Sequence, residues 1–137
     1  MGKENVDIGI REKSEFEIKK ADNIKFWNEC GVKPLFNELS DKALDRRNKN
    51  GDVICDLMEN ETSESMSLVI NWYYVEGRYS TVSVSRREEK GVYFLTRENG
   101  EKKEGIKFDT SKPEEKKEML NKINSVFLQY LIPPFEK

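Results

Sequence analysis

Apolar and polar residues alternate in five short segments between residues 53 and 108, and this alternation constrains the fold more than any other feature. A period of two sends successive side chains to opposite faces of a β-strand. The longest segment, 66–75, places five large apolar or aromatic residues on one parity, namely Met66, Leu68, Ile70, Trp72 and Tyr74. Turn signals separate the segments. Asn99–Gly100 is the strongest, because both residues tolerate the positive φ of a type I′ turn. We therefore expect an antiparallel meander of about five strands.

A C-terminal helix is expected after the meander. Apolar residues recur at steps of three and four between Met119 and Leu131, which places them on one side of a helix. Ser111 and Glu114 have the spacing of a capping box, in which each side chain accepts from the other residue's backbone amide. The apolar side of this helix needs cover, and one face of the sheet is its natural partner.

The segment before the meander predicts two helices and a short strand. Asp22 can cap a first helix that Gly31 ends, and Pro34 suits the first turn of a second helix. Residues 14–19 alternate polar and apolar side chains, as a short half-buried strand does. Residues 1–13 are expected to form a flexible arm.

The expected architecture is an α+β fold. An antiparallel β-meander of about five strands, with the short N-terminal strand, is packed on one face by two N-terminal helices and a C-terminal helix. Residues 14–137 then form a single domain, in keeping with a chain of 137 residues. No apolar run suits a signal peptide or a membrane span, and the two cysteines lack metal-binding spacing. We therefore expect a cytoplasmic protein with reduced thiols and no membrane partner.

The sequence contains no histidine, which removes the commonest general base together with Ser-His-Asp, Cys-His and histidine-bearing zinc sites. Phosphate-binding glycine loops, nucleophile motifs and calcium-loop patterns are also missing from it. We therefore expect a protein that is not an enzyme and uses no cofactor. A carboxylate-dependent metal enzyme stays an alternative, since a few converging acidic residues can hold Mg²⁺.

Charge is distributed unevenly along a chain whose net charge is only −2. Residues 51–76 carry six acidic side chains and no Lys or Arg, whereas residues 77–137 carry thirteen basic and ten acidic ones. An acidic surface speeds encounter with a basic partner. We call residues 52–64 the acidic segment. Its candidate protein-binding residues are Asp52, Asp56, Glu59, Glu61 and Glu64.

These features favour a small non-enzymatic module that recognises another protein, of the inhibitor, immunity or adaptor type. The acidic segment and the exposed face of the sheet would contact a partner with a basic surface. A strand left open at the edge of the meander would also allow a homodimer.

Binding of single-stranded nucleic acid is the alternative function. Tyrosines and basic residues gather on the hairpins after the acidic segment, where rings can stack on bases and cations can neutralise phosphates. Several glutamates lie among them and would cancel part of the positive field. The candidate residues are Arg78, Tyr79, Arg86, Arg87, Tyr93, Arg97, Lys102, Lys103 and Lys107.

Overall fold

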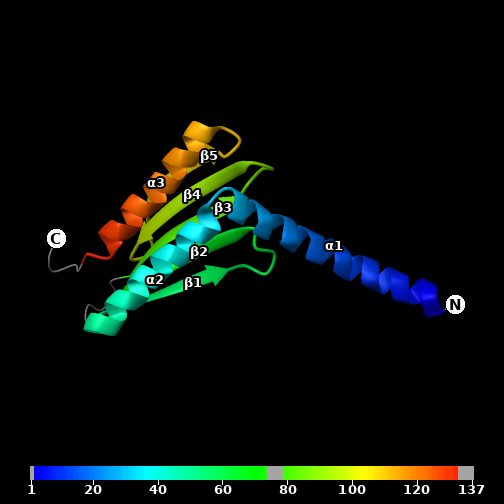
Figure 1. The fold of residues 1–137 in the computed structure, drawn as a ribbon, viewed down its shortest axis with the longest axis horizontal. Helices are drawn as coiled ribbons and strands as arrows, with labels where there is room; N and C mark the ends of the chain where they lie inside the picture. The colour runs from blue at the N-terminus through cyan, green and yellow to red at the C-terminus, as the bar shows by residue number, and fades with distance from the viewer. Residues whose placement is uncertain (1, 74–78, 133–137) are drawn as a thin grey trace.

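The computed structural model of the chain describes residues 2–73 and 79–132, with side chains from residue 15 to 47 and from residue 51 onward within these ranges. The elements follow one another as Figure 1 shows. They are α1 (Gly2–Glu29), α2 (Val32–Asn50), β1 (Val53–Glu59), β2 (Ser65–Trp72), β3 (Tyr79–Arg86), β4 (Gly91–Glu98), β5 (Glu101–Asp109) and α3 (Pro113–Tyr130).

The five strands form one antiparallel sheet in the order β1-β2-β3-β4-β5, which confirms the expected meander. The turn between β4 and β5 also agrees with the sequence, since Asn99 and Gly100 have φ values of 54° and 84°. A register shift at Thr96/Arg97 makes the pairing of β4 with β5 irregular. Strands that are consecutive in the chain are therefore also adjacent in the sheet.

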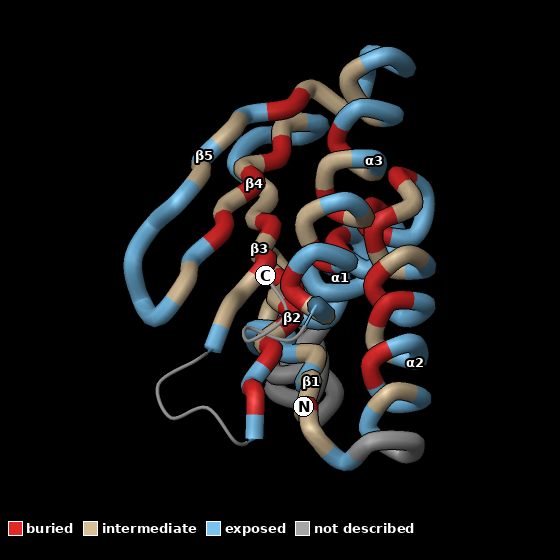
Figure 2. Tube along the Cα trace, turned by 90° about the vertical axis from the view of Figure 1, so that its left-hand side faces the viewer, coloured by how far each residue is buried: buried red, intermediate tan, exposed pale blue. Residues whose placement is uncertain are grey.

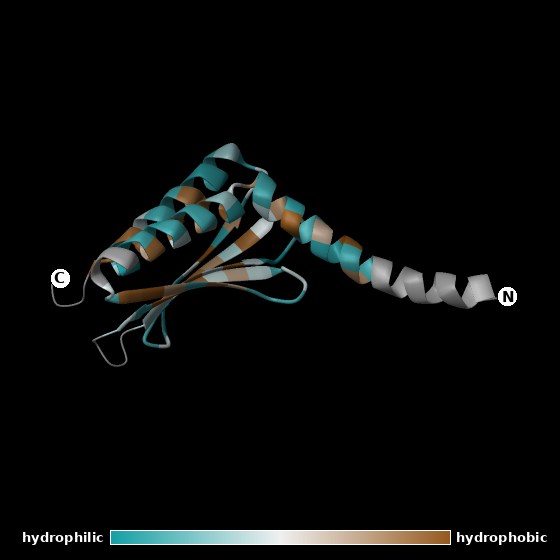
Figure 3. Ribbon diagram, turned by 60° about the horizontal axis from the view of Figure 1, so that its bottom comes forward, coloured by the Kyte–Doolittle hydropathy of each residue, from teal (hydrophilic) through white to brown (hydrophobic). Residues whose placement is uncertain are grey.

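The helices lie on one side of the sheet (Figure 2), as expected from the apolar stripe of α3. Burial alternates along β2, where Met66, Leu68, Ile70 and Trp72 are buried and the residues between them are not. On α3 the buried residues are Met119, Ile123, Phe127 and Tyr130. Hydrophilic residues predominate on the outer side of the helical layer (Figure 3). The core therefore lies between the helices and one face of the sheet.

Gly31 separates α1 from α2, as the sequence predicts. Its φ of 89° is left-handed, and a Cβ at this position would lie 3.1 Å from Leu120 Cδ1. Glycine is the residue that combines such a φ with so close an approach to α3. The two tryptophans lie in the core, with Trp27 1% and Trp72 6% exposed.

The predicted strand over residues 14–19 is wrong, because α1 runs through it. Phe16 precedes Asn23 by seven residues and Trp27 by eleven, so its position fits a helix whose buried side holds those two residues. Six residues are too few to separate that period from a period of two. Asp22 consequently lies inside α1 and caps no helix. Residues 2–13 share the same helix, and their role as a separate flexible arm stays a prediction.

The predicted capping box of α3 is also wrong. Lys112 is the N-cap residue, and no side chain caps the helix there. The Ser111 hydroxyl instead donates to the Asp109 carboxylate at 2.6 Å, and the Asp109 amide donates to Glu115 Oε1 at 3.2 Å. The N-cap position falls one residue after Ser111, so Ser111 does not occupy the position that the capping box requires.

The C-terminal half of α1 is fastened to the loop between β1 and β2. Trp27 Nε1 donates to the carbonyl oxygen of Ser63 at 2.6 Å, and Asn23 Nδ2 donates to that of Thr62 at 2.9 Å. Ser63 is buried and has a φ of 57°. From this attachment α1 leads away from the sheet towards the N-terminus (Figure 1).

Candidate functional site

The face of the sheet opposite the helices is here called the open face. Its described side chains are half-buried or exposed, and none of them is buried. Residues on this face follow from the strand register and the alternation of burial. They are Ile54, Asp56 and Met58 on β1, Ser65, Ser67, Val69 and Asn71 on β2, Tyr79, Thr81, Ser83 and Ser85 on β3, Tyr93, Leu95 and Arg97 on β4, and Gly105 and Lys107 on β5.

Small hydroxyl side chains occupy the middle of the open face. Ser65 pairs with Ser85 and Ser67 with Ser83 across β2 and β3. Because these side chains are short, they leave a hollow of about 330 Å³ beside Met58. These serines belong to no sequence motif, although the period of two in β2 and β3 places them on one face.

Charge on the open face is divided between its two sides. Asp56 is exposed on β1 at one side, whereas Arg97 on β4 and Lys107 on β5 are exposed at the other. Between them the face carries hydroxyl, aliphatic and aromatic groups. The charge separation noted along the sequence is therefore also present across this surface.

The acidic segment divides into paired and unpaired carboxylates. Glu64 pairs with Lys19 of α1 at 2.5 Å, Glu59 pairs with Lys33 of α2, and Asp52 lies 3.6 Å from Arg46 of α2. Asp56 and Glu61 are exposed and have no ion pair with a described residue.

Three of the five acidic candidates therefore connect the N-terminal helices to β1 and to the residues just before and after it. The count of charges within residues 51–76 missed these pairs because all three cations lie outside that segment, on the N-terminal helices. Two carboxylates, Asp56 and Glu61, remain without an ion pair among the described residues.

The basic candidates are also divided. Arg86 turns toward α1, where one terminal nitrogen donates to Asp22 and to Asn23 at 2.8 Å each, and its guanidinium lies 4.3 Å from the centre of the Phe26 ring. Arg97 donates to the carbonyl oxygen of Gly100 at 3.2 Å. Lys103 pairs with Glu101 at 3.3 Å. Arg78 lies outside the described residues.

A smaller cluster surrounds Tyr93 on the open face. The Arg87 guanidinium lies 5.3 Å and the Lys102 ammonium 5.9 Å from the centre of the ring. Lys107 pairs with Tyr93 across β4 and β5. Tyr79 is 39% exposed on β3. The structure thus brings together Arg87, Tyr93, Lys102 and Lys107, and directs Arg86 elsewhere.

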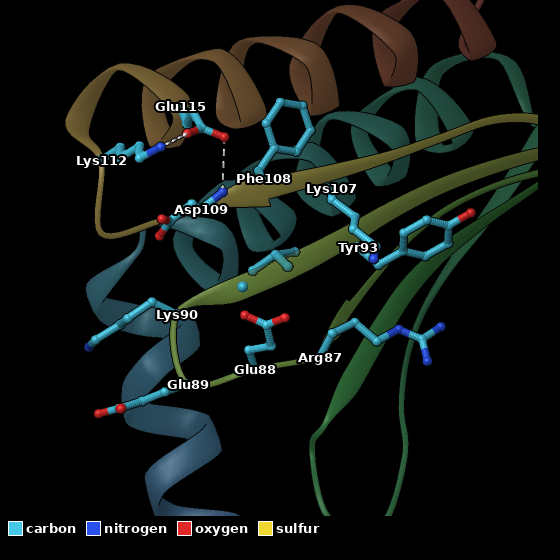
Figure 4. Close-up of a pocket in the computed structure, with 12 residues that line it drawn as sticks. Arg87, Glu88, Glu89, Lys90, Tyr93, Lys107, Phe108, Asp109, Lys112 and Glu115 are labelled. Carbon is cyan, nitrogen blue, oxygen red and sulfur yellow. Dashed lines mark hydrogen bonds and ion pairs between the residues drawn. The ribbon is translucent and has the colours of Figure 1, made fainter.

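A pocket of about 630 Å³ opens next to this cluster, between the β3–β4 loop and the start of α3. Figure 4 shows Lys107 directed toward Tyr93 at one end, and Asp109 with Glu115 at the other. Glu88, Glu89, Lys90 and Lys112 also line it. Charges of both signs therefore face the pocket, which suits no ligand of a single charge.

Both cysteines are free thiols, Cys30 in the core and Cys55 half-buried on β1. Burial raises the pKa of Cys55 from its ordinary value of 9.0 to about 12, and the Asp56 carboxylate beside it adds to the shift. Burial likewise raises the pKa of Cys30. Thiols whose pKa is raised react slowly, because the thiolate is the nucleophile.

We expect Cys55 of the folded protein to react with iodoacetamide at pH 8 about two to three orders of magnitude more slowly than an unfolded thiol.

The raised pKa of Cys55 also makes the free energy of unfolding depend on pH. Between pH 9 and pH 12 the Cys55 thiol keeps its proton in the folded state but loses it in the unfolded state. Its contribution to the free energy of unfolding is therefore fully present below pH 9 and falls as pH rises toward 12. Urea unfolding at pH 8 and pH 10.5 measures this fall, which should be smaller in Cys55→Ala. An equal fall in both proteins would contradict the assignment.

Carboxylates do not gather into a metal site in the part of the chain that the structure describes, since no three metal-ligating side chains lie together there. Among the same residues, no helix is long and apolar enough to cross a membrane. None of the family models, curated proteins and solved structures compared with this chain matches it.

Proposed function

We propose that the protein is a non-enzymatic module that binds another protein through the open face and the unpaired carboxylates of the acidic segment. The proposal is carried by one observation: the helices cover one face of the sheet and leave the other uncovered. That uncovered face presents Val69, Leu95 and Met58 around a hydroxyl-lined hollow. Apolar groups in the middle of a polar surface are the usual composition of a binding site for protein.

The composition of the open face supports a protein partner further. Tyrosine and serine together offer large apolar area and adaptable hydrogen bonds at low entropic cost. Asp56 and Glu61 add negative charge at one side, where they would steer a partner with a basic surface. An inhibitor, immunity or adaptor role would need such a binding surface and no catalytic group.

Affinity capture from lysate tests the proposal, with nuclease added to remove nucleic acid. The open-face variant carries Val69→Lys and Leu95→Lys, which place charge in the middle of the face. The matched control carries Asn121→Lys and Leu128→Lys on exposed positions of α3. We expect wild type and control to capture the same protein and the open-face variant to lose it by at least tenfold. Equal capture by all three would contradict the proposal, provided that circular dichroism shows all three folded.

Single-stranded nucleic acid is the second candidate ligand, because the cluster of Arg87, Lys102 and Lys107 around Tyr93 joins cations to an aromatic ring. The acidic side chains of the adjacent pocket oppose it. The nuclease separates the two candidates within the same experiment. Capture that nuclease abolishes would favour nucleic acid.

A further inference from the structure

The outer edge of β1 has backbone groups whose direction follows from the register. The amide of Tyr73 donates to the carbonyl of Asp52, and that of Asn60 donates to the carbonyl of Ser65. Hydrogen-bonded pairs alternate along an antiparallel ladder. Residues 54, 56 and 58 therefore direct their amides and carbonyls toward β2. The amides and carbonyls of residues 53, 55, 57 and 59 point outward.

This edge is open in the part of the chain that the structure describes. No hydrogen bond from a described residue reaches the outward amides or carbonyls of Cys55 and Leu57. Figure 1 shows β1 as the last strand at its side of the sheet, with α2 lying over the face. An unpaired row of donors and acceptors is a template for another strand.

The two edges of the sheet differ in their protection. β5 carries Lys102, Lys103 and Lys107 together with two glutamates, and its pairing with β4 is irregular. Charge, especially lysine, and bulges are the usual means of blocking edge pairing. β1 has an uninterrupted register and no lysine, arginine, proline or glycine. Its pairing edge is therefore the less protected of the two.

Apolar groups flank the β1 edge on the side of the helices. Cys55 and Leu57 are half-buried there. Leu44, which is 50% exposed, follows Lys33 by three helical turns, and Lys33 contacts Glu59 of β1. Residues three turns apart lie on the same side of a helix. Leu44 therefore adds an exposed apolar residue to the side of α2 that carries Lys33.

On the open face the same edge presents a single exposed charge. Asp56 lies between Ile54 and Met58, and it has no ion pair with a described residue. A side chain of an added strand that lies opposite Asp56 would be close enough to pair with it. The edge thus favours apolar residues on one side of an added strand and a cation on the other.

We propose that β1 accepts an extended segment of another protein as an additional antiparallel strand, about as long as β1 itself. The segment alternates: apolar residues lie opposite Cys55 and Leu57, and a lysine or arginine lies opposite Asp56. This inference rests on the proposed function and specifies how the partner binds. It is β-strand addition, in which the backbone supplies affinity and alternate side chains supply specificity.

Charge favours a basic segment over a second copy of this chain. Pairing two β1 strands would bring together the Asp56 and Glu61 carboxylates of two copies, which have no ion pair with a described residue of their own chain. In the register centred on Asp56 this residue would face its own copy, and like charges directly opposite destabilise a sheet.

Hydrogen exchange with a synthetic probe tests the strand addition. The probe is an eight-residue peptide that alternates Val and Lys. We expect the amides of Cys55 and Leu57 to exchange at least tenfold more slowly with the peptide than without it. The amides of Ile54, Asp56 and Met58 already point to β2 and should change little. Peptide binding without this alternating pattern, or no binding, would overturn the strand addition.

Two matched comparisons separate backbone pairing from attraction between charges. Methylation of the valine amides, which would face β1, should weaken binding at least tenfold, whereas methylation of the lysine amides should be tolerated. Asp56→Lys should weaken binding of the Val-Lys peptide at least tenfold and allow a Val-Glu peptide to bind instead. Glu61→Lys, at a position outside β1, should have a smaller effect on binding of the Val-Lys peptide. Equal effects of the two methylations would overturn the pairing. If captured protein still depends on Val69 and Leu95 while β1 gains no protection, the proposed function stands and only strand addition fails.

Discussion

Replacing Phe127 by alanine is expected to lower the free energy of unfolding by about 3–5 kcal/mol. The Phe127 ring is fully buried in the core, on the side of α3 that faces the sheet. Its removal deletes apolar contacts and leaves a cavity that the surrounding helix and strands can fill only in part. A loss of this size is a large fraction of the stability of a single domain.

Urea unfolding followed by far-ultraviolet circular dichroism measures this change. Leu128→Ala is the matched control, because Leu128 is the next residue of the same helix and is 39% exposed. The control should cost no more than about 1 kcal/mol. Similar losses in the two variants would mean that α3 does not lie on the sheet through the side that holds Phe127.

Replacing Trp27 by alanine is the second large change, and it should act on the β1–β2 loop as well as on global stability. The indole is 1% exposed, packs edge to face on Phe26 with centroids 5.0 Å apart, and donates to the Ser63 carbonyl. Loss of the ring should cost about 3–5 kcal/mol. The Ser63 carbonyl also loses its donor, which destabilises a residue held at positive φ.

Two measurements separate these effects. Urea unfolding followed by the fluorescence of Trp72 gives the global loss, and hydrogen exchange at Ser63 and Glu64 gives the local one. Both amides should exchange faster in Trp27→Ala than the global loss alone accounts for. Ile24→Ala is the control, since Ile24 lies one turn earlier on α1 and is 40% exposed. Unchanged relative protection of the loop would refute its attachment through Trp27.

The sheet could be predicted from the sequence because its physical cause is local. One face of β2, β3 and β4 packs on the helices, so the buried positions at every second residue are mostly apolar. Asn99–Gly100 specified its turn for an equally local reason, the positive φ of both residues. The stripe of α3 was readable because one continuous side of that helix is buried.

The extent of α1 and the pairing of the charges could not be predicted in the same way. Over residues 14–19 an alternating pattern agrees with both a strand and a helix, and only the burial of Asn23 and Trp27 decides between them. Arg86 was assigned to a binding face, yet it reaches Asp22 across more than sixty positions of the chain. Counts of charge along a sequence contain no information about such partners. Only the structure shows that three of the five acidic candidates are paired, which leaves Asp56 and Glu61 without an ion pair to a described residue.

The sequential order of the strands has a consequence for how the chain folds. A short connection joins each strand to the next one in the chain. Little chain entropy is therefore lost when each new strand pairs with its predecessor. The attachment of α1 joins residues 36 and 39 positions apart, and the bond from Trp72 to the Tyr130 carbonyl spans 58. We therefore expect the hairpins to form before the helical layer closes, which would leave the apolar face of the nascent sheet briefly exposed to solvent.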